Sequence, residues 1–438
     1  MVTIYKPKAA PRGPKHTELT IERMDHEAQG IHRQDGVVSF ISGALPGERV
    51  RVALTEQKKH FQHGHVIKVL EASPLRQALH CDSNTRCGGC QLGFVAPSDA
   101  LVLKTKGVAD LLTHQLKLTE LPWQAPIVGD ALGYRRKARI GVWFEQKTQQ
   151  FQIGFRGFQS KEIVDVPQCV VLSPAIAPAI DVLRRTLPQL KQGKAITHVE
   201  LLDADGQAYV VVRHVKSLPE TDRAALCAAW PQANWLGEAE PGVLQPWHAQ
   251  PEPSYVLADG QRLQFSANDF IQVNAKVNQQ MVAQALAWLM PEKSDQVLDL
   301  YCGIGNFSLA LAAHVQQVVG VEGVQSMVQR ASANAALNRL TNVEFYQADL
   351  HLPWAKAAWA ARHYDKILLD PARAGAEGAI EQIAARKAKQ VLYVSCNATT
   401  FARDAKVLLA NGYRIAKIGV MDMFPYTSHL ELMALFEK

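Results

Sequence analysis

Strand-like and helix-like segments alternate through the C-terminal part of this sequence, and this alternation constrains the fold more than any other feature. Apolar segments of strand length lie near residues 296–300, 318–322, 343–347, 365–370, 390–395, 413–420 and 430–436. Helical segments separate them, and one more, from Asn274 to Leu289, precedes the first strand. Such alternation predicts a doubly wound parallel sheet. We therefore expect an α/β Rossmann-like domain over residues 266–438.

Acidic residues stand at the ends of the first three predicted strands. Asp299 precedes a glycine turn whose spacing is not the dinucleotide-binding G-x-G-x-x-G, and a carboxylate there would repel a pyrophosphate. It suits a ligand that presents an amino group instead. Glu322 can accept the two hydroxyls of a ribose, and Asp349 is placed for an adenine amino group. Together they predict a site for S-adenosylmethionine.

The fifth predicted strand ends in a cysteine, within the segment Val391–Asn397. Open α/β sheets carry their chemistry at the carboxyl ends of the strands, so Cys396 is a candidate nucleophile. The alternative is that Cys396 is a small buried apolar residue. Asp370 ends the fourth strand, and in a methyltransferase this position faces the group that is methylated.

A thiol beside a methyl donor has a chemical reason when the target is carbon 5 of a pyrimidine. That carbon is too poor a nucleophile to take a methyl group until a thiolate adds to carbon 6. A base must then remove the proton from carbon 5. Glu431, at the start of the last strand, is the candidate base, with His429 as the alternative. Both could equally be ordinary polar residues at a strand edge.

The N-terminal part predicts a small β-barrel preceded by a loose basic arm over residues 1–15. Short β-rich segments separated by turns fill residues 16–76, as in oligonucleotide-binding barrels. A predicted loop from Lys58 to His65 carries two lysines, three histidines and Phe61. This composition suits RNA, although a solvated hairpin tip and a histidine metal site are alternatives.

Between barrel and sheet, residues 77–265 predict a β-rich α+β domain. A helix is expected from about Pro97 to Leu116, with two more near 174–192 and 219–230. The basic run Tyr134–Arg139, together with Arg156 and Lys161, is the best candidate for an RNA-facing surface. A solvated strand face remains the alternative.

Seven cysteines in 438 residues argue against a disulfide framework and favour a reducing compartment. Cys81, Cys87, Cys90 and the distant Cys169 supply four thiolates, which suit either zinc or an iron–sulfur cluster. Neither a membrane-spanning segment nor an export signal is present, so we expect a cytoplasmic protein. The net charge of +6 permits a polyanionic partner without requiring one.

Several motifs resemble the RNA uracil-C5-methyltransferase family. They are Phe270–Asn274, Asp299–Phe307, Asp370–Gly375, Val394–Asn397 and His429–Glu431. The resemblance implies that Cys396 is the nucleophile and Glu431 the proton acceptor. It also implies a set of contacts to S-adenosylmethionine, of which Asp370 could also touch the uracil: Gln272, Tyr301, Asn306, Glu322, Asp349 and Asp370.

The N-terminal barrel resembles a TRAM domain, an RNA-binding module. The cysteine pattern resembles that of a subgroup in which Cys81, Cys87, Cys90 and Cys169 would hold a 4Fe-4S cluster. The presence of both features is similar to the 23S rRNA branch of the family, which implies uridine 1939 as the target. We therefore expect a monomer with 23S rRNA as partner and no membrane or DNA partner. Alternatives are another uridine in rRNA or tRNA, a cytosine target, and a non-catalytic RNA-binding protein.

Overall fold

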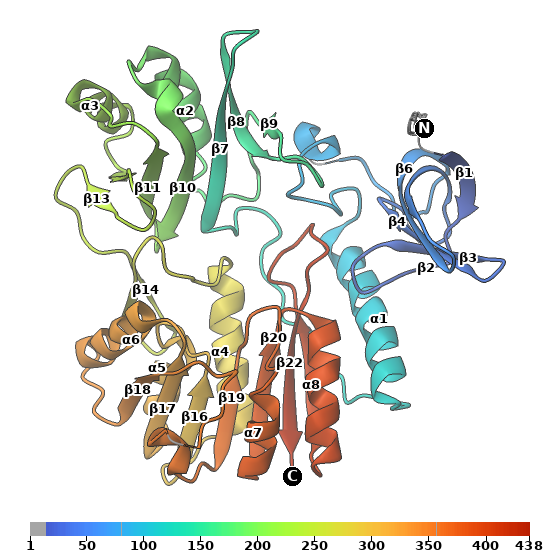
Figure 1. Ribbon diagram of the computed structural model, residues 1–438, viewed down its shortest axis with the longest axis vertical. Helices are drawn as coiled ribbons and strands as arrows, with labels where there is room; N and C mark the ends of the chain where they lie inside the picture. The colour runs from blue at the N-terminus through green and yellow to red at the C-terminus, as the bar shows by residue number, and fades with distance from the viewer. Residues whose placement is uncertain (1–14, 80, 356) are drawn as a thin grey trace, which may run out of the picture. The chain divides into compact units, whose positions relative to one another are not determined.

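The computed structural model describes residues 15–79, 81–355 and 357–438 (Figure 1). The predicted basic arm lies outside the described residues, apart from Lys15 at the start of a strand. The chain forms two compact units. One combines the described part of residues 1–80 with residues 91–111, and the other combines residues 81–90 with residues 112–438. Within the described ranges, no helix has the length and apolar character that crossing a membrane requires.

The first unit contains a six-stranded sheet in the order β1-β5-β6-β4-β3-β2. Its strands are β1 (Lys15–Thr20), β2 (Arg23–Met24), β3 (Gly30–Gln34), β4 (Val37–Ser42), β5 (Arg49–Gln57) and β6 (Phe61–Glu71). Alternate residues of β5, such as Val50 and Val52, point into a small apolar core. Helix α1 (Pro97–Leu116) has the predicted bounds. Gly107 in this helix lets it approach the backbone of Asp25, because a Cβ there would lie 2.4 Å from the Asp25 carbonyl oxygen.

Strand β6 corrects the predicted loop from Lys58 to His65. The strand begins at Phe61, so Phe61, His63 and His65 belong to the sheet, and the connection is limited to residues 58–60. The His63 ring stacks on Phe40 with 5.1 Å between ring centroids. Strand pairing therefore continues further than the polar composition of this segment suggests.

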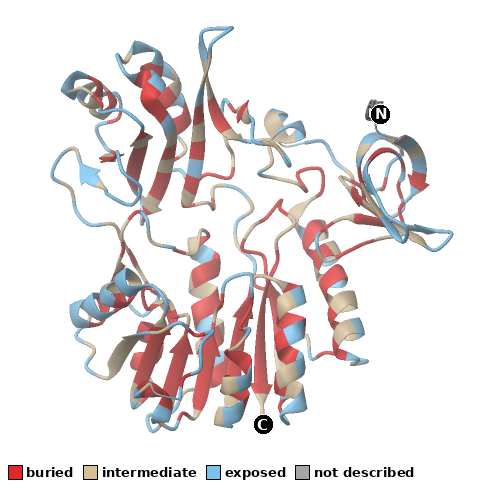
Figure 2. Ribbon diagram, in the orientation of Figure 1, coloured by how far each residue is buried: buried red, intermediate tan, exposed pale blue. Residues whose placement is uncertain are grey.

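The second unit begins with a seven-stranded sheet in the order β13-β12-β11-β10-β7-β8-β9. Its strands are β7 (Lys137–Glu145), β8 (Gln150–Arg156), β9 (Ile163–Asp165), β10 (Ile196–Ala204), β11 (Gln207–His214), β12 (Asn234–Glu238) and β13 (Gln245–Pro246). Helices α2 (Ala179–Thr186) and α3 (Glu220–Ala229) pack their apolar sides, including Leu183 and Leu226, against one face of this sheet (Figure 2). Short 3-10 helices are η1 (Asp82–Thr85), η2 (Leu187–Gln189), η3 (Gly193–Ala195) and η4 (Trp359–Ala361).

A two-stranded ribbon, β14 (Ser254–Val256) and β15 (Arg262–Gln264), leads into the C-terminal domain. That domain has a second seven-stranded sheet in the order β18-β17-β16-β19-β20-β22-β21. Its strands are β16 (Gln296–Leu300), β17 (Gln317–Glu322), β18 (Val343–Gln347), β19 (Lys366–Leu369), β20 (Gln390–Ser395), β21 (Arg414–Met421) and β22 (Glu431–Glu437). Its helices are α4 (Ala275–Leu289), α5 (Asn306–Ala312), α6 (Gln325–Leu337), α7 (Ile380–Arg386) and α8 (Ala398–Ala410).

Helices cover both faces of the C-terminal sheet, as the alternation of its sequence predicts. Successive residues of a strand point to opposite faces. Leu392 of β20 joins the core formed with α4, whereas the next residue, Tyr393, donates a hydrogen bond to Asp404 of α8 (2.6 Å). The Tyr393 ring also packs on Phe401 of α8. The inner strands of the sheet are buried on both sides, which explains their nearly continuous apolar sequences.

The sheet is not wholly parallel, and this corrects the fold prediction. Strand β22 is inserted between β20 and β21 and runs antiparallel to both. The start of β22 therefore lies at the edge where β20 ends, with Leu432 opposite Ser395. An all-parallel sheet would have placed the start of this strand at the far edge.

Candidate active site

The turn after β16 is a strained loop that opens into helix α5. Tyr301 has a φ of 60°, a left-handed conformation that is uncommon for a residue with a side chain. Gly303 and Gly305 also have positive φ, and a Cβ on Gly305 would lie 2.4 Å from Leu309. Backbone strain of this kind is concentrated at functional sites. The turn thereby places backbone of small residues at the edge of a cavity, where a ligand can approach closely.

Asn306, the first residue of α5, is held by a reciprocal amide pair. Its Oδ1 accepts hydrogen bonds from Tyr255 Oη (2.9 Å) and Asn278 Nδ2 (3.1 Å), and its Nδ2 donates to Asn278 Oδ1 (2.9 Å). The amide group is therefore fixed in one orientation. Sequence reasoning missed Tyr255 and Asn278, because neither belongs to a local motif and only the fold brings them to Asn306.

Two acidic residues brace the same turn. Glu322 accepts hydrogen bonds from the backbone nitrogens of Gly303 (3.1 Å) and Val324 (3.0 Å). Asp299 is fully buried and accepts from Ser308 Oγ at 2.5 Å. Burial raises the pKa of Asp299 to about 7, with smaller contributions from nearby carboxylates. Its Oδ1 has no partner within the described part of the protein, and neither does the buried Tyr301 hydroxyl.

These orphaned polar atoms fit a bound ligand. A buried polar atom without a partner costs roughly 1–3 kcal/mol, so such atoms commonly mark where an unseen group binds. An amino group of the ligand would satisfy the Asp299 carboxylate. The donor set therefore fits S-adenosylmethionine, which carries an ammonium group, ribose hydroxyls and an adenine amine.

A cavity of about 480 Å³ lies over the carboxyl ends of β16, β19 and β20. This volume is within the usual range of small-molecule sites. Its lining includes seven of the nine residues predicted for catalysis and S-adenosylmethionine: Gln272, Tyr301, Asn306, Glu322, Asp370, Cys396 and Glu431. Asp299, which is fully buried behind the turn, and Asp349 do not line the cavity. Asp349 caps the turn after β18 by accepting from the His351 nitrogen (3.0 Å), and its charge still raises the pKa of Tyr301.

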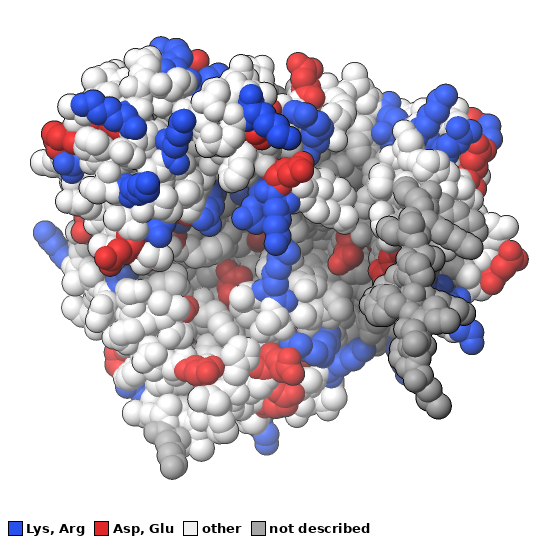
Figure 3. Space-filling model, turned by 45° about the horizontal axis from the view of Figure 1, so that its top comes forward, with Lys and Arg blue, Asp and Glu red and all other residues white. Residues whose placement is uncertain are grey.

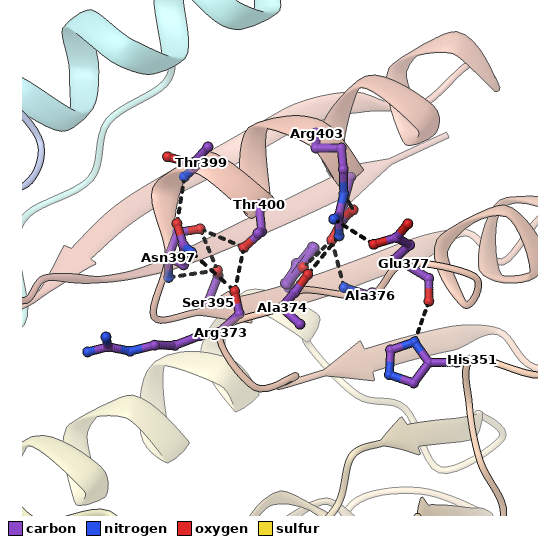
Figure 4. Close-up of polar contacts among 12 residues, drawn as sticks. His351, Arg373, Ala374, Ala376, Glu377, Ser395, Asn397, Thr399, Thr400 and Arg403 are labelled. Atoms are coloured by element: carbon purple, nitrogen blue, oxygen red, sulfur yellow. Dashed lines mark hydrogen bonds and ion pairs between the residues drawn. The ribbon is translucent and has the colours of Figure 1, made fainter. Parts of the chain in front are cut away.

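Cys396 lies between β20 and α8. The residues next to it, Ser395 and Asn397, belong to a hydrogen-bonded network that fixes this loop (Figure 4). Asn397 caps α8, because its side chain accepts from the nitrogen of Thr399 (3.0 Å). Asn397 Nδ2 and Thr400 Oγ1 both donate to the carbonyl oxygen of Arg373 (3.1 and 3.2 Å). The loop that carries Cys396 is thus bound to the loop after β19.

Arg373 brings a positive charge to the thiol. Its guanidinium lies 3.0 Å from the ring nitrogens of His429, and both side chains line the cavity. Burial and the charges of Glu431 and Asp370 raise the pKa of Cys396 to about 11, whereas the charge of Arg373 lowers it. Arg373 belongs to the Asp370–Gly375 motif but receives no role from sequence reasoning. The sequence feature that could have indicated a role is its position, because Arg373 is a cation that closely follows the acid Asp370 at the end of a strand.

Two carboxyls lie beside Cys396, of which Glu431 is buried and Asp370 is half-buried. Burial raises the pKa of Glu431 to about 7. Burial, with the charge of Glu431, holds the pKa of Asp370 well above its usual range. Near neutral pH this site therefore holds a carboxyl that can take up or release a proton, as a general base requires.

The four predicted cluster cysteines lie in one neighbourhood of the second unit. Burial, together with the charges of Cys169, Cys87 and Cys81, raises the pKa of Cys90 to about 12. The Cys87 segment pairs with the end of β8, through a hydrogen bond from Gly88 N to Arg156 O (2.9 Å). Residues 15–79, 81–355 and 357–438 contain no group of three side chains set to hold one metal ion. A cluster of several iron atoms requires more widely spaced thiolates than one ion does, so four neighbouring thiols without a single-ion site are compatible with such a cluster.

Part of the predicted RNA-facing run is buried. Arg136 is 4% exposed, stacks on the Tyr255 ring at 4.5 Å and donates from Nε to the carbonyl oxygen of Gln272 (2.7 Å). Tyr134 is also buried, and its hydroxyl donates to the carbonyl oxygen of Pro425 (3.4 Å). These two side chains are therefore not available to RNA. Arg136 instead holds the backbone of Gln272, a residue that lines the cavity. Arg139 keeps an exposed side chain.

Comparisons with known proteins identify the family and the fold of the chain. Residues 255–351 and 356–438 match the family described as tRNA (Uracil-5-)-methyltransferase, and residues 15–67 match the TRAM domain. A crystal structure of Pyrococcus abyssi tRNA (uracil-54, C5)-methyltransferase with S-adenosyl-L-homocysteine aligns with a TM-score of 0.74 at 22% identity, covering 96% of this chain and 100% of that one. The fold is thus that of an S-adenosylmethionine-dependent methyltransferase with an N-terminal TRAM domain.

Relatives that align with the chain over its full length identify a narrower family. The chain is 45% identical to the 23S rRNA (uracil(1939)-C(5))-methyltransferase RlmD of Vibrio cholerae over 100% of both proteins. It is 43% identical to RlmD of Aliivibrio fischeri, also over 100% of both. The chain belongs to the RlmD family of RNA uracil-C5-methyltransferases. The prediction of the family and of the TRAM domain is thereby confirmed.

Proposed function

We propose that this protein methylates carbon 5 of uridine 1939 in 23S rRNA, the target named for its full-length relatives. One structural observation carries the chemistry. The antiparallel pairing of β22 with β20 brings Glu431 to the edge where Cys396 lies, and both line one cavity with the glycine turn. A thiol and a carboxyl on one side of a methyl-donor site supply the two groups that methylation at carbon 5 requires.

In the proposed reaction the Cys396 thiolate adds to carbon 6 of the uracil, and the electron pair of the C5–C6 double bond moves to carbon 5. S-adenosylmethionine, when bound, supplies the methyl group to that carbon as an electrophile. Glu431 then removes the proton from carbon 5, the double bond re-forms, and the Cys396 thiolate leaves. Arg373 stabilises the thiolate before addition, since its charge lowers the pKa of Cys396.

The methyl donor would be held by residues of the glycine turn and the neighbouring strand ends. Glu322 would accept the ribose hydroxyls, and Gln272, Tyr301, Asn306 and Asp370, which also line the cavity, would make the other direct contacts. Asp299 and Asp349 do not line the cavity, and for them we propose the amino group and the adenine amine as partners once the donor is bound. Support for this assignment comes from the orphaned oxygens of Asp299 and Tyr301 and from the fixed amide of Asn306.

The target is tested by mapping 5-methyluridine in rRNA. We expect that cells lacking this protein lose 5-methyluridine at position 1939 of 23S rRNA, and that the full-length protein restores it. Mass spectrometry of nuclease digests measures the modification at each position. Methylation of tRNA alone, or of a cytidine, would contradict the proposal.

We further propose that Cys81, Cys87, Cys90 and Cys169 hold a 4Fe-4S cluster with a structural role. Methyl transfer of the kind above needs no electron transfer, so the cluster has no step in it. Cys90 and Cys169 pack against Tyr134, Val171 and Tyr426, and the segment around Tyr426 continues to His429 at the cavity. A bound cluster would therefore fix the segment that leads to Glu431.

Removal of one cluster ligand gives a direct test. We expect Cys169→Ser, purified without oxygen, to lose both iron and acid-labile sulfide, whereas wild type contains them in equal amounts. Metal analysis and a sulfide assay measure this, and hydrogen exchange of residues 424–431 should become faster in the variant. Cys227→Ser, at a half-buried cysteine outside the cluster, is the control. Zinc without sulfide in wild type would overturn the assignment.

A further inference from the structure

Strand β7 presents an exposed face that the catalytic site does not use. Ala138, Ile140 and Val142 point into the core beneath α2. The alternate positions point the other way. Of these, the Arg139 side chain is 62% exposed and Trp143 is 57% exposed. Lys and Arg side chains gather over this domain in the upper part of Figure 3, where the turned molecule brings its top forward.

The exposed side chain of Trp143 on β7 indicates a binding surface. A buried indole ranks among the largest apolar groups a protein can remove from water, so leaving more than half of one exposed forgoes considerable free energy. Trp143 lies directly opposite Gln152 of β8, whose polar side chain cannot cover the ring. The indole therefore presents a flat π-surface to solvent on the same face of β7 as Arg139.

The exposed face begins at the edge of the catalytic cavity. Lys137, the first residue of β7, donates from Nζ to the carbonyl oxygens of Ala267 (2.8 Å) and Asp269 (2.7 Å). The next residue along that segment, Phe270, lines the cavity and is 66% exposed. A strand of RNA that leaves the cavity past Phe270 therefore meets β7 without interruption.

Arg139 is held in place on this face by a neutral histidine. Its Nη2 lies 2.6 Å from a ring nitrogen of His198 on β10, and Glu200 lies 3.9 Å from its Nε. Burial, with the charge of Arg139, lowers the pKa of His198 to about 4, although Glu238 opposes this and Arg213 adds to it. His198 is therefore an uncharged acceptor near neutral pH, and the guanidinium keeps other donors available to a phosphate.

From this arrangement we propose that the RNA strand beside the target uridine crosses the exposed face of β7, with Arg139 at a phosphate and Trp143 stacked on a base. The inference rests on the proposed RNA substrate. Arg139 and Trp143 are four positions apart along the strand, which corresponds to about 13 Å at about 3.3 Å per residue. That distance spans at most about four nucleotides stacked at about 3.4 Å each. Stacking requires no particular base, so Trp143 contributes affinity and not sequence preference.

The test compares Trp143→Ala with Trp143→Phe in the full-length protein, using a transcribed 23S rRNA fragment that contains the target uridine. We expect Trp143→Ala to raise the KM for RNA by roughly tenfold, the loss of one base–aromatic stack, with kcat and the KM for S-adenosylmethionine unchanged. Trp143→Phe keeps a ring and should stay within about threefold of wild type. Val243→Ala, at an exposed apolar side chain outside this face, serves as the matched control.

Shortening the RNA locates the contact. When the fragment is trimmed from its 5′ side and, separately, from its 3′ side, the difference between Trp143→Ala and wild type should disappear in one series. An unchanged KM in Trp143→Ala, or an equal loss in Trp143→Phe, overturns the inference. A loss seen only with ribosomal particles and not with naked RNA also overturns it, because the partner would then be a protein. If wild type does not methylate the fragment, the proposed function itself fails.

Discussion

Replacement of Cys396 by alanine should abolish methylation while leaving both ligands bound. In the proposed reaction the Cys396 thiol adds to carbon 6, and loss of a covalent nucleophile commonly costs at least about 10⁴-fold in kcat. We expect no detectable transfer of a radiolabelled methyl group to 23S rRNA, with an unchanged Kd for S-adenosylmethionine in calorimetry. The Cys396 side chain is only partly buried, so the fold should persist.

A substituted RNA separates loss of the nucleophile from loss of a positioning group. Wild type incubated with RNA that contains 5-fluorouridine at the target should form a covalent adduct, because fluorine on carbon 5 cannot be removed as a proton is. The adduct appears as a slower band on a denaturing gel. Cys396→Ala should form none, whereas Cys227→Ala should form as much as wild type. An adduct that persists in Cys396→Ala would show that another side chain is the nucleophile.

The rate at which Cys396 is alkylated should increase with pH, because burial and the neighbouring carboxyls raise the pKa of this thiol. With a pKa of about 11, the thiolate fraction of Cys396 rises about tenfold per pH unit between pH 7 and pH 10. In the resting enzyme very little thiolate is present near neutral pH, because burial and the charges of Glu431 and Asp370 disfavour it. In the proposed reaction, the uracil is attacked by the small fraction that Arg373 stabilises.

Local patterns were sufficient for the elements of the C-terminal domain. Strand β16 (Gln296–Leu300) and helix α4 (Ala275–Leu289) match the predicted segments within a residue. Both are determined by nearby sequence: an apolar run before a glycine turn for the strand, and Asn274 as a helix cap for α4. Such signals act over a few residues and need no knowledge of the tertiary fold.

Strand direction and side-chain burial could not be read in the same way. Nothing in the sequence of β22 states that it inserts antiparallel between β20 and β21, yet this insertion alone brings Glu431 to Cys396. Arg136 likewise looks like a surface cation in a basic run. Its burial depends on the ring of Tyr255, far along the chain, and on the carbonyl oxygen of Gln272. Contacts between distant segments decided both cases.

Replacement of Glu431 by glutamine should stop the reaction after methyl transfer. The amide cannot take the proton from carbon 5, so the methylated uridine stays bonded to Cys396, and turnover falls by about 10²- to 10⁴-fold, the usual contribution of a general base. We expect a covalent protein–RNA adduct with unmodified uridine as substrate, heavier than the sum of protein and RNA by one CH2 unit, because a methyl group is gained and the thiol proton of Cys396 is lost. Intact-mass spectrometry measures it. Glu381→Gln, at an exposed acid in α7, is the control and should turn over normally.

The same substitution should change the reactivity of the thiol in the opposite direction from its effect on turnover. The charge of Glu431 raises the pKa of Cys396, so its removal lowers that pKa and iodoacetamide should label the thiol faster at pH 8. In wild type, Glu431 has a pKa of about 7 and is increasingly protonated as the pH is lowered below that value. As the pH is lowered, kcat/KM should therefore decrease more steeply below pH 7 than it does above pH 7. A variant that alkylates more slowly and forms no adduct would mean that Glu431 acts before the thiol adds, as a base for Cys396. Faster alkylation together with an accumulating adduct would show that Glu431 acts after methyl transfer. The same carboxyl would then disfavour the thiolate in the resting enzyme and remove the proton from carbon 5 once Cys396 is bonded to carbon 6.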